Sequence, residues 1–209
     1  MKKFVIPAII AKNQEELDLG IKKVQNFSKI IQLDFMDGVF VPNHSIDFDF
    51  KIPKINCFFE AHLMLKNPLD WIVKNFSKVD MILTHYEALS NPQKVIDFVR
   101  NEGKKIGFVL NPETSVDELF DYLDQLDQIL IMTVNPGFYG SPFIPEIVKK
   151  ISELREIAPK LDIEVDGGIT DKTIDIVDEA GANMFVSGSY ILKSKNIKQA
   201  FDRLNKILA

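Results

Sequence analysis

Two acidic segments, more than a hundred residues apart, are the places where this chain could perform acid–base chemistry. Residues 32–38 read QLDFMDG, and residues 163–168 read IEVDGG. Each has the composition of a β-strand that ends in a carboxylate and then breaks at glycine. If both strands end at one rim of a barrel, their carboxylates can face each other across a small substrate. One can then remove a proton from a carbon and the other can return it on the opposite face, which is epimerase or isomerase chemistry.

The composition is that of a globular chain without a nucleic-acid partner. The 209 residues are 46% hydrophobic, carry a net charge of −5 and show no dense stripe of Lys and Arg. This length allows one full core and is short for two, so we expect a single domain over residues 1–209. The one cysteine, Cys57, fits a reducing compartment. No signal peptide or membrane span is visible, so we expect a cytoplasmic protein that does not bind membranes.

Short apolar runs alternate with longer amphipathic stretches along the chain. The apolar runs predict eight strands, at residues 4–10, 30–35, 56–64, 80–85, 105–110, 128–134, 162–166 and 183–187. The amphipathic stretches predict helices at residues 15–27, 68–76, 92–102, 116–123, 144–157, 171–180 and 197–208. Eight βα units imply parallel strands and predict the α/β class, as a single (β/α)₈ TIM barrel. The alternative is a doubly wound open sheet, but the first βα turn lacks a Gly-x-Gly-x-x-Gly signature.

Strand periodicity indicates which side chains face the barrel mouth. The active site of such a barrel lies at the carboxyl ends of its strands. Alternation puts Gln32, Asp34 and Met36 on one face, and Glu60, His62 and Met64 on one face of the next strand. Glu60 could orient His62 or could be a buried carboxylate paired elsewhere. Asp37 has the opposite parity, so we expect it to order the loop that follows rather than to do chemistry. His85 is expected to be structural.

Several motifs resemble those of the ribulose-phosphate 3-epimerase family over nearly the whole chain. They lie at residues 34–43 (DFMDGVFVPN), 61–64 (AHLM), 85–88 (HYEA), 132–138 (MTVNPGF), 165–168 (VDGG) and 186–189 (VSGS). The resemblance implies an enzyme that inverts C3 of a 2-keto sugar phosphate, converting ribulose 5-phosphate and xylulose 5-phosphate into each other. Residues 110–114 and 142–146 are similar to a hexulose-phosphate relative, allulose-6-phosphate 3-epimerase, so the substrate stays open. The family also suggests a homo-oligomer, a dimer or a hexamer.

The resemblance also implies roles for individual residues. Asp34 and Asp166 match the two acid/base residues, which act through an enediolate. A divalent metal (Zn, Mn, Fe or Mg) is implied, with Asp34, His62 and Asp166 as ligands. The fourth family ligand is a histidine, and this chain has Gln32 at that position. Because an amide oxygen is a poorer ligand than imidazole for zinc-like metals, we expect a weak site with substoichiometric metal.

Glycine-bearing loops predict the substrate and phosphate site. The loops after the seventh and eighth strands of such barrels commonly bind phosphate, through backbone N–H groups that glycine exposes. The predicted substrate-binding set is His62, Gly137, Phe138, Tyr139, Gly140, Gly167, Gly168, Gly188, Ser189, Met36, Met64 and Met132. The methionines are expected to pack at the barrel mouth and to keep water away. Ala8 and residues 139–141 (YGS) depart from the family, which has Ser and usually Gly-Gly-Gln at these places.

Other functions compete with an epimerase. Phosphosugar decarboxylases and hexulose-phosphate synthases resemble the phosphate loops but carry an Asp-x-Lys-x-x-Asp core. Residues 34–37 (DFMD) lack that lysine, which argues against them. A non-catalytic phosphosugar-binding protein is kept open by Ala8 and Gln32. A strand-end aspartate before glycine is also often just a turn residue, but the presence of both Asp34 and Asp166 favours an active enzyme.

Overall fold

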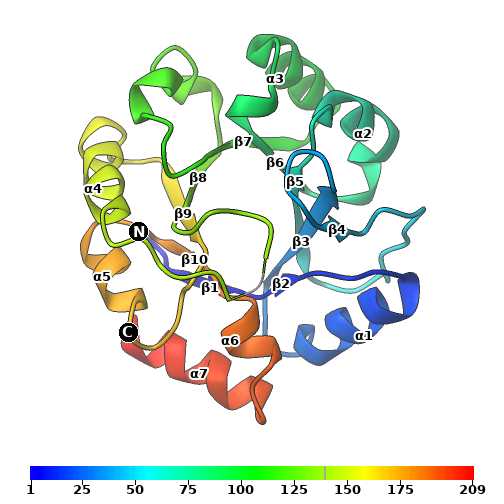
Figure 1. Cartoon of the computed structure of the whole chain (residues 1–209), viewed down its shortest axis with the longest axis vertical. Coiled ribbons are helices and arrows are strands. Elements are labelled where there is room, and N and C mark those ends of the chain that lie inside the picture. The colour runs from blue at the N-terminus through cyan, green and yellow to red at the C-terminus, as the bar shows by residue number, and fades with distance from the viewer. Residues whose placement is uncertain (139) are drawn as a thin grey trace.

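Parallel strands form a ring in the computed structural model, which describes residues 1–138 and 140–209. Figure 1 looks down this ring, with the helices outside it. The ring strands are β1 (Phe4–Ile6), β2 (Ala8–Ile9), β3 (Ile30–Asp37), β5 (Phe58–Met64), β6 (Met81–His85), β7 (Lys105–Leu110), β8 (Gln128–Met132), β9 (Asp162–Asp166) and β10 (Met184–Val186). The predicted TIM barrel is therefore confirmed. Tyr139, which the sequence places in the substrate site, lies outside the described residues.

The ring closes through residues 4–9. Pro7 separates β1 from β2, because proline has no N–H to give to a strand ladder. β1 pairs with β10, and β2 pairs with β3, so the same short segment contacts both flanking strands. The Pro7 carbonyl still accepts a hydrogen bond from the Gln32 N–H at 3.0 Å. A short antiparallel strand, β4 (His44–Ser45), pairs with the end of β3.

The helices cover the outside of the ring with apolar stripes. They are α1 (Gln14–Val24), α2 (Pro68–Asn75), α3 (Pro92–Asn101), α4 (Ile147–Ile157), α5 (Ile174–Glu179), α6 (Ser189–Leu192) and α7 (Ile197–Ile207). In α1, Leu17, Ile21 and Val24 are buried at helical spacing, and the Asn13 side chain caps the first turn. In the described part of the chain, no helix is both long and apolar enough to cross a membrane.

The helix predicted at residues 116–123 is wrong. The segment instead forms two short 3₁₀ turns, Val116–Leu119 and Leu123–Gln125. Only Val116 and Leu119 are buried there, and Phe120, which made the stretch look amphipathic, is 51% exposed. One 3₁₀ turn is enough to bury two residues that are three apart. The predicted helix start at residue 144 is also early, because Pro145 keeps the preceding residue out of the helical region.

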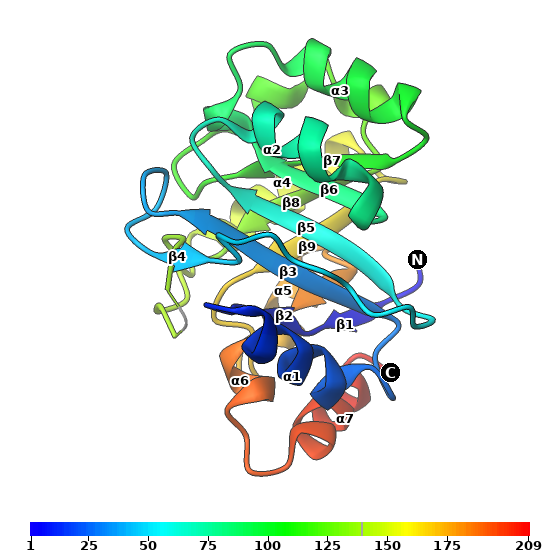
Figure 2. The ribbon, with the colours of Figure 1, turned by 90° about the vertical axis from the view of Figure 1, so that its right-hand side faces the viewer.

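The two ends of the barrel differ in what they carry. Side chains on the inward strand faces fill the barrel, including a cluster of Met81, Leu83, Val109, Leu130 and Met132. A larger apolar core lies between the strands and the helices. In Figure 2, the carboxyl ends of the strands, β4 and the loop after β8 lie at one end, and both chain termini lie at the other. The end with the loops is the mouth of the barrel.

Candidate active site

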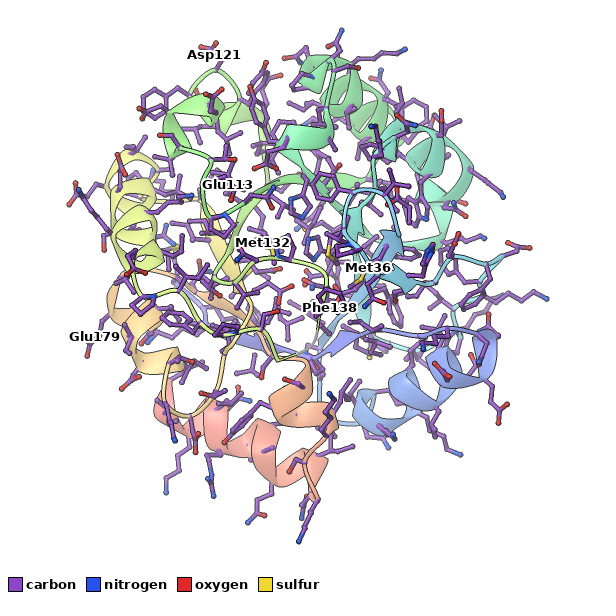
Figure 3. The ribbon with its side chains drawn as sticks, viewed as in Figure 1. Met36, Glu113, Asp121, Met132, Phe138 and Glu179 are labelled. Carbon is purple, nitrogen blue, oxygen red and sulfur yellow. The ribbon has the colours of Figure 1, made fainter. Side chains whose placement is uncertain are left out.

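A cavity opens at the barrel mouth, and the loop after β8 passes across it (Figure 1). Every predicted site residue in the described part of the chain lines this cavity, except Gln32, which is fully buried. Those that line it are Asp34, Met36, His62, Met64, Met132, Gly137, Phe138, Gly140, Asp166, Gly167, Gly168, Gly188 and Ser189. Met36, Met132 and Phe138 lie near the middle of the ring in Figure 3, whereas Asp121 and Glu179 lie at its outer edge. The cavity also touches Val134, Ile169, Thr170 and Val186, which the sequence did not single out.

Asp34, His62 and Asp166 form a tight cluster at the floor of this cavity. Strand register puts Asp34 beside His62, and it puts Asp166 at the end of β9. The Nδ1 atom of His62 lies 3.4 Å from Asp34 Oδ1 and 3.4 Å from Asp166 Oδ2. The two carboxylates, from strands far apart in sequence, therefore approach one imidazole nitrogen.

Burial and hydrogen bonding shift the pKa values of Asp34 and His62. Burial raises the pKa of Asp34 above its ordinary value, partly offset by its hydrogen bond to His62. Burial alone would lower the pKa of His62, but hydrogen bonds to Asp166 and Asp34 outweigh it and raise the pKa to about 9. When no cation is bound, His62 is therefore positively charged at neutral pH and balances part of the carboxylate charge.

His85 supports His62 from below, a contact that the sequence analysis missed. The two Nε2 atoms are 3.0 Å apart, and the ring centroids are 5.1 Å apart in a stacked arrangement. Burial lowers the pKa of His85 to about 4, so this ring is neutral and its Nε2 can accept a hydrogen bond from the His62 Nε2–H group. Its Nδ1 lies 3.4 Å from Glu87 Oε2. Strand parity was the available signal, because His85 shares the inward face of β6 with Met81 and Leu83.

A layer of buried carboxyl groups lies deeper in the barrel. Glu60 and Glu164 are both fully buried, and Gln128 donates to Glu164. Burial raises the pKa of Glu60 to about 8, and burial together with the charge of Glu60 raises that of Glu164 well above its usual value. Among the described residues, neither Glu60 oxygen has a hydrogen-bond partner. Glu60 therefore does not orient His62 through a hydrogen bond. Of the alternative, a buried carboxylate paired elsewhere, the burial is confirmed and the pairing is not.

Asp37 orders the loop after β3, as predicted. Its Oδ1 accepts hydrogen bonds from the backbone N–H groups of Val39 (2.9 Å) and Phe40 (2.8 Å), and its Oδ2 accepts one from Lys66 (2.8 Å). Although partial burial opposes it, these bonds lower the pKa of Asp37. Both carboxylate oxygens of Asp37 thus accept hydrogen bonds from loop backbone, and the side chain stabilises the loop conformation.

The glycine loops after β8 and β9 pack directly against each other. Gly167 has φ +117°, a conformation that side chains rarely adopt, and a Cβ there would run into Val134. The Thr133 hydroxyl donates to the carbonyl of Gly167, which links the two loops. The Asn43 side chain donates to the Gly137 carbonyl at 2.8 Å and ties the loop after β3 to the same rim.

Comparison with known proteins identifies the family. Residues 4–192 match the ribulose-phosphate 3 epimerase family. The chain belongs to this family. It is 36% identical over 211 residues to the ribulose-phosphate 3-epimerase of Bacillus subtilis, covering 96% of this chain and 97% of that protein. It is 39% identical over 208 residues to that of Synechocystis sp., covering 94% of this chain and 90% of the relative.

Solved structures agree on the fold. KGPDC from Streptococcus mutans superposes with a TM-score of 0.71 at 14% identity and full coverage of both chains. At this identity the likeness speaks for the barrel alone. Membership of the epimerase family, in contrast, makes the protein an isomerase that inverts a stereocentre in a carbohydrate derivative.

Three residues of this epimerase-family site fit a divalent cation. One ligand atom each from Asp34, His62 and Asp166 can be chosen so that all lie within 4.8 Å of one another. Bonds to a tetrahedral zinc ion place neighbouring ligand atoms about 3.4 Å apart. The two distances from His62 Nδ1 to the carboxylate oxygens have this value. Gln32 does not complete the set, because it turns its amide nitrogen rather than its oxygen toward the carboxylates.

Proposed function

We propose that the protein is a ketose-phosphate 3-epimerase that converts D-ribulose 5-phosphate and D-xylulose 5-phosphate into each other. The observation that carries this proposal is the convergence of Asp34 and Asp166 on one cavity, each with an oxygen 3.4 Å from the same His62 nitrogen. Two carboxyl groups from different strands can reach a substrate carbon from two directions. Family membership and the ribulose-phosphate 3-epimerases among its relatives support the substrate class. A homo-oligomer, dimer or hexamer, remains part of the proposal.

The proposed mechanism uses the two aspartates in complementary protonation states. The Asp166 carboxylate removes the C3 proton, and the electron pair of the C–H bond moves into an enediolate. Asp34, the more buried of the two, is the acid that delivers a proton to the opposite face of C3, a role that the upward shift of its pKa by burial favours. After one turnover Asp34 is the base and Asp166 the acid, so the reverse reaction uses the same pair.

The remaining cavity residues support this transfer. A cation held by Asp34, His62 and Asp166 would supply positive charge that stabilises the enediolate. Met36, Met64 and Met132 are each no more than 3% exposed and keep water from the carbanion. Gly168, Gly188 and Ser189 line the cavity in the segments that follow β9 and β10, and we propose that their backbone N–H groups bind the phosphate of the substrate.

Deuterium exchange at C3 tests the proposal. Incubation with ribulose 5-phosphate in deuterated water, with and without Mn²⁺ or Zn²⁺, should give xylulose 5-phosphate labelled at C3. Parallel incubation with allulose 6-phosphate tests the hexulose alternative, and labelling of that sugar alone would reassign the substrate. No label in either sugar under any condition would favour a non-catalytic sugar-phosphate-binding protein and would overturn the proposal.

A further inference from the structure

Gln32 bridges the two proposed acid/base residues with one amide nitrogen. Its Nε2 donates to Asp34 Oδ1 at 2.8 Å and to Asp166 Oδ2 at 2.8 Å, and it lies 3.4 Å from His62 Nδ1. The side chain is fully buried in the barrel. The nitrogen thus contacts Asp34, Asp166 and His62, the three candidate metal ligands. It occupies the position that a fourth ligand of a tetrahedral site would take.

The orientation of this amide follows from charge. If the amide were turned over, its oxygen would face two carboxylate oxygens at hydrogen-bond distance, which is repulsive unless a cation lies between them. In the observed orientation both N–H bonds have acceptors. Across the described residues, the Gln32 Oε1 atom is buried without any partner, which is unfavourable. The observed orientation therefore leaves Oε1 without a hydrogen bond, while Nε2 donates to both carboxylates.

We propose that Gln32 is a positioning residue that holds Asp34 and Asp166 through a shared N–H bridge, in place of a tightly bound cation. This inference rests on the proposed function, because it concerns the same two carboxyl groups. An amide nitrogen has no lone pair to offer a metal ion, so a cation must break two hydrogen bonds and turn the amide before it can bind. The epimerase reaction accordingly proceeds in the metal-free protein, and divalent cations bind weakly.

Metal affinity is the first readout and needs no activity. Protein treated with EDTA is dialysed against Zn²⁺ at several free concentrations, for the wild type and for Gln32→His. Imidazole is a zinc ligand and the amide nitrogen is not, so Gln32→His should bind one Zn²⁺ per chain at least about 100-fold more tightly. Equal, tight binding of one Zn²⁺ per chain by the wild type would overturn the inference. Circular dichroism and melting curves establish that the variant is folded.

The second readout separates the bridge from simple packing. Gln32→Glu keeps the size of the side chain but replaces both N–H donors by a third carboxylate oxygen. We expect it to lower kcat of the metal-free protein at least about 100-fold with little change in KM, and to bind Mn²⁺ more tightly than the wild type. Gln32→Met, which only fills the space, should also lower kcat. Unchanged kcat in both variants would show that Gln32 merely packs.

The final comparison distinguishes the failure of this inference from that of the proposed function. C3 deuterium exchange is measured for wild type and Gln32→His, each stripped with EDTA and each reloaded with Zn²⁺ or Mn²⁺. The inference predicts exchange by the stripped wild type within about threefold of its reloaded form. Exchange only by the metal-reloaded proteins would support the proposed function but refute the inference that Gln32 acts in place of a cation. No exchange by any form would sink the function itself.

Discussion

Asp34 and Asp166 are chemically similar residues that their surroundings make different. The Asp34 side chain is 7% exposed, and burial raises its pKa, whereas the Asp166 side chain is 16% exposed. Between them lies His62, whose charge both carboxylates stabilise. In the proposed mechanism the more buried Asp34 is the proton donor and the more exposed Asp166 is the base.

Replacing either aspartate by asparagine should therefore stop proton transfer. We expect Asp34→Asn and Asp166→Asn each to lower kcat by about 10³-fold or more, because neither amide can take or give the C3 proton. C3 deuterium exchange measures this. Asp121→Asn, at an exposed position on the outer edge of the ring, is the matched control and should leave exchange unchanged. Near-normal exchange in either site variant would refute the two-aspartate mechanism.

His85 should matter to catalysis through His62 alone. Its Nε2 is the partner of His62 Nε2 at 3.0 Å, so His85→Asn leaves a buried N–H without an acceptor. We expect kcat to fall by about 10–100-fold while KM for the sugar phosphate changes little. His44→Asn, at an exposed histidine of β4, is the matched control. A change confined to KM would contradict a positioning role.

Glu60 makes stability depend on pH. Its pKa is raised from 4.5 to about 8, so the unfolded chain loses this proton at lower pH than the folded protein. The folded state is then penalised increasingly as pH rises from 4.5, and the penalty is complete above about 8. Glu60→Gln should remove a penalty on the order of a few kcal/mol, raising Tm by roughly 5–10 °C at pH 8 but little at pH 4.

The control for this measurement is Glu179→Gln, at an exposed position in α5. It should leave Tm unchanged at both pH values. If Glu60→Gln lowered Tm equally at pH 4 and pH 8, the side chain would be needed for packing, and its buried charge would not be the cause.

At the scale of elements, the loops on the rim depend on backbone conformation. Gly167→Ala places a Cβ against Val134 at φ +117°, so the loops after β8 and β9 must separate. We expect a higher KM for the sugar phosphate, by about 10-fold or more, and a loss of about 2 kcal/mol of stability.

Gly103→Ala is the matched control, since Gly103 has φ +70° but open space around the added carbon. It should cost about 1 kcal/mol in urea unfolding and leave KM unchanged. Equal effects of the two variants on KM would contradict a role for the rim loops in substrate binding.

Periodicity predicts most elements of this barrel, since strands and helices follow the apolar pattern to within a few residues. It fails at residues 116–123, where Phe120 looks like a core residue but is 51% exposed. It also places Gln32 and Asp34 on one face, which is correct. Periodicity could not show which atom of the Gln32 amide meets Asp34 and Asp166, because two strands far apart in sequence, β3 and β9, set that geometry together.

At the scale of the whole molecule, ring closure joins residues that are far apart in sequence. β1 pairs with β10 (Phe4 with Met184), whereas β5 and β6 pair over a short stretch (Glu60 with Met81). Long-range pairing must overcome a larger loop-closure entropy. Pulsed hydrogen exchange during refolding should therefore protect β5 and β6 amides before those of Phe4 and Ser187, which close the ring. Earlier protection of Phe4 and Ser187 would contradict this order.

The Pro7 break has a consequence for synthesis in the cell. On a ribosome, β2 can pair with β3 early, but β1 has no strand to pair with until β10 emerges, some 180 residues after it. Until then, a growing chain exposes strand edges at β1 and β9, which invite pairing with other nascent chains. Chaperone capture of stalled intermediates should therefore be strongest just before β10 is translated.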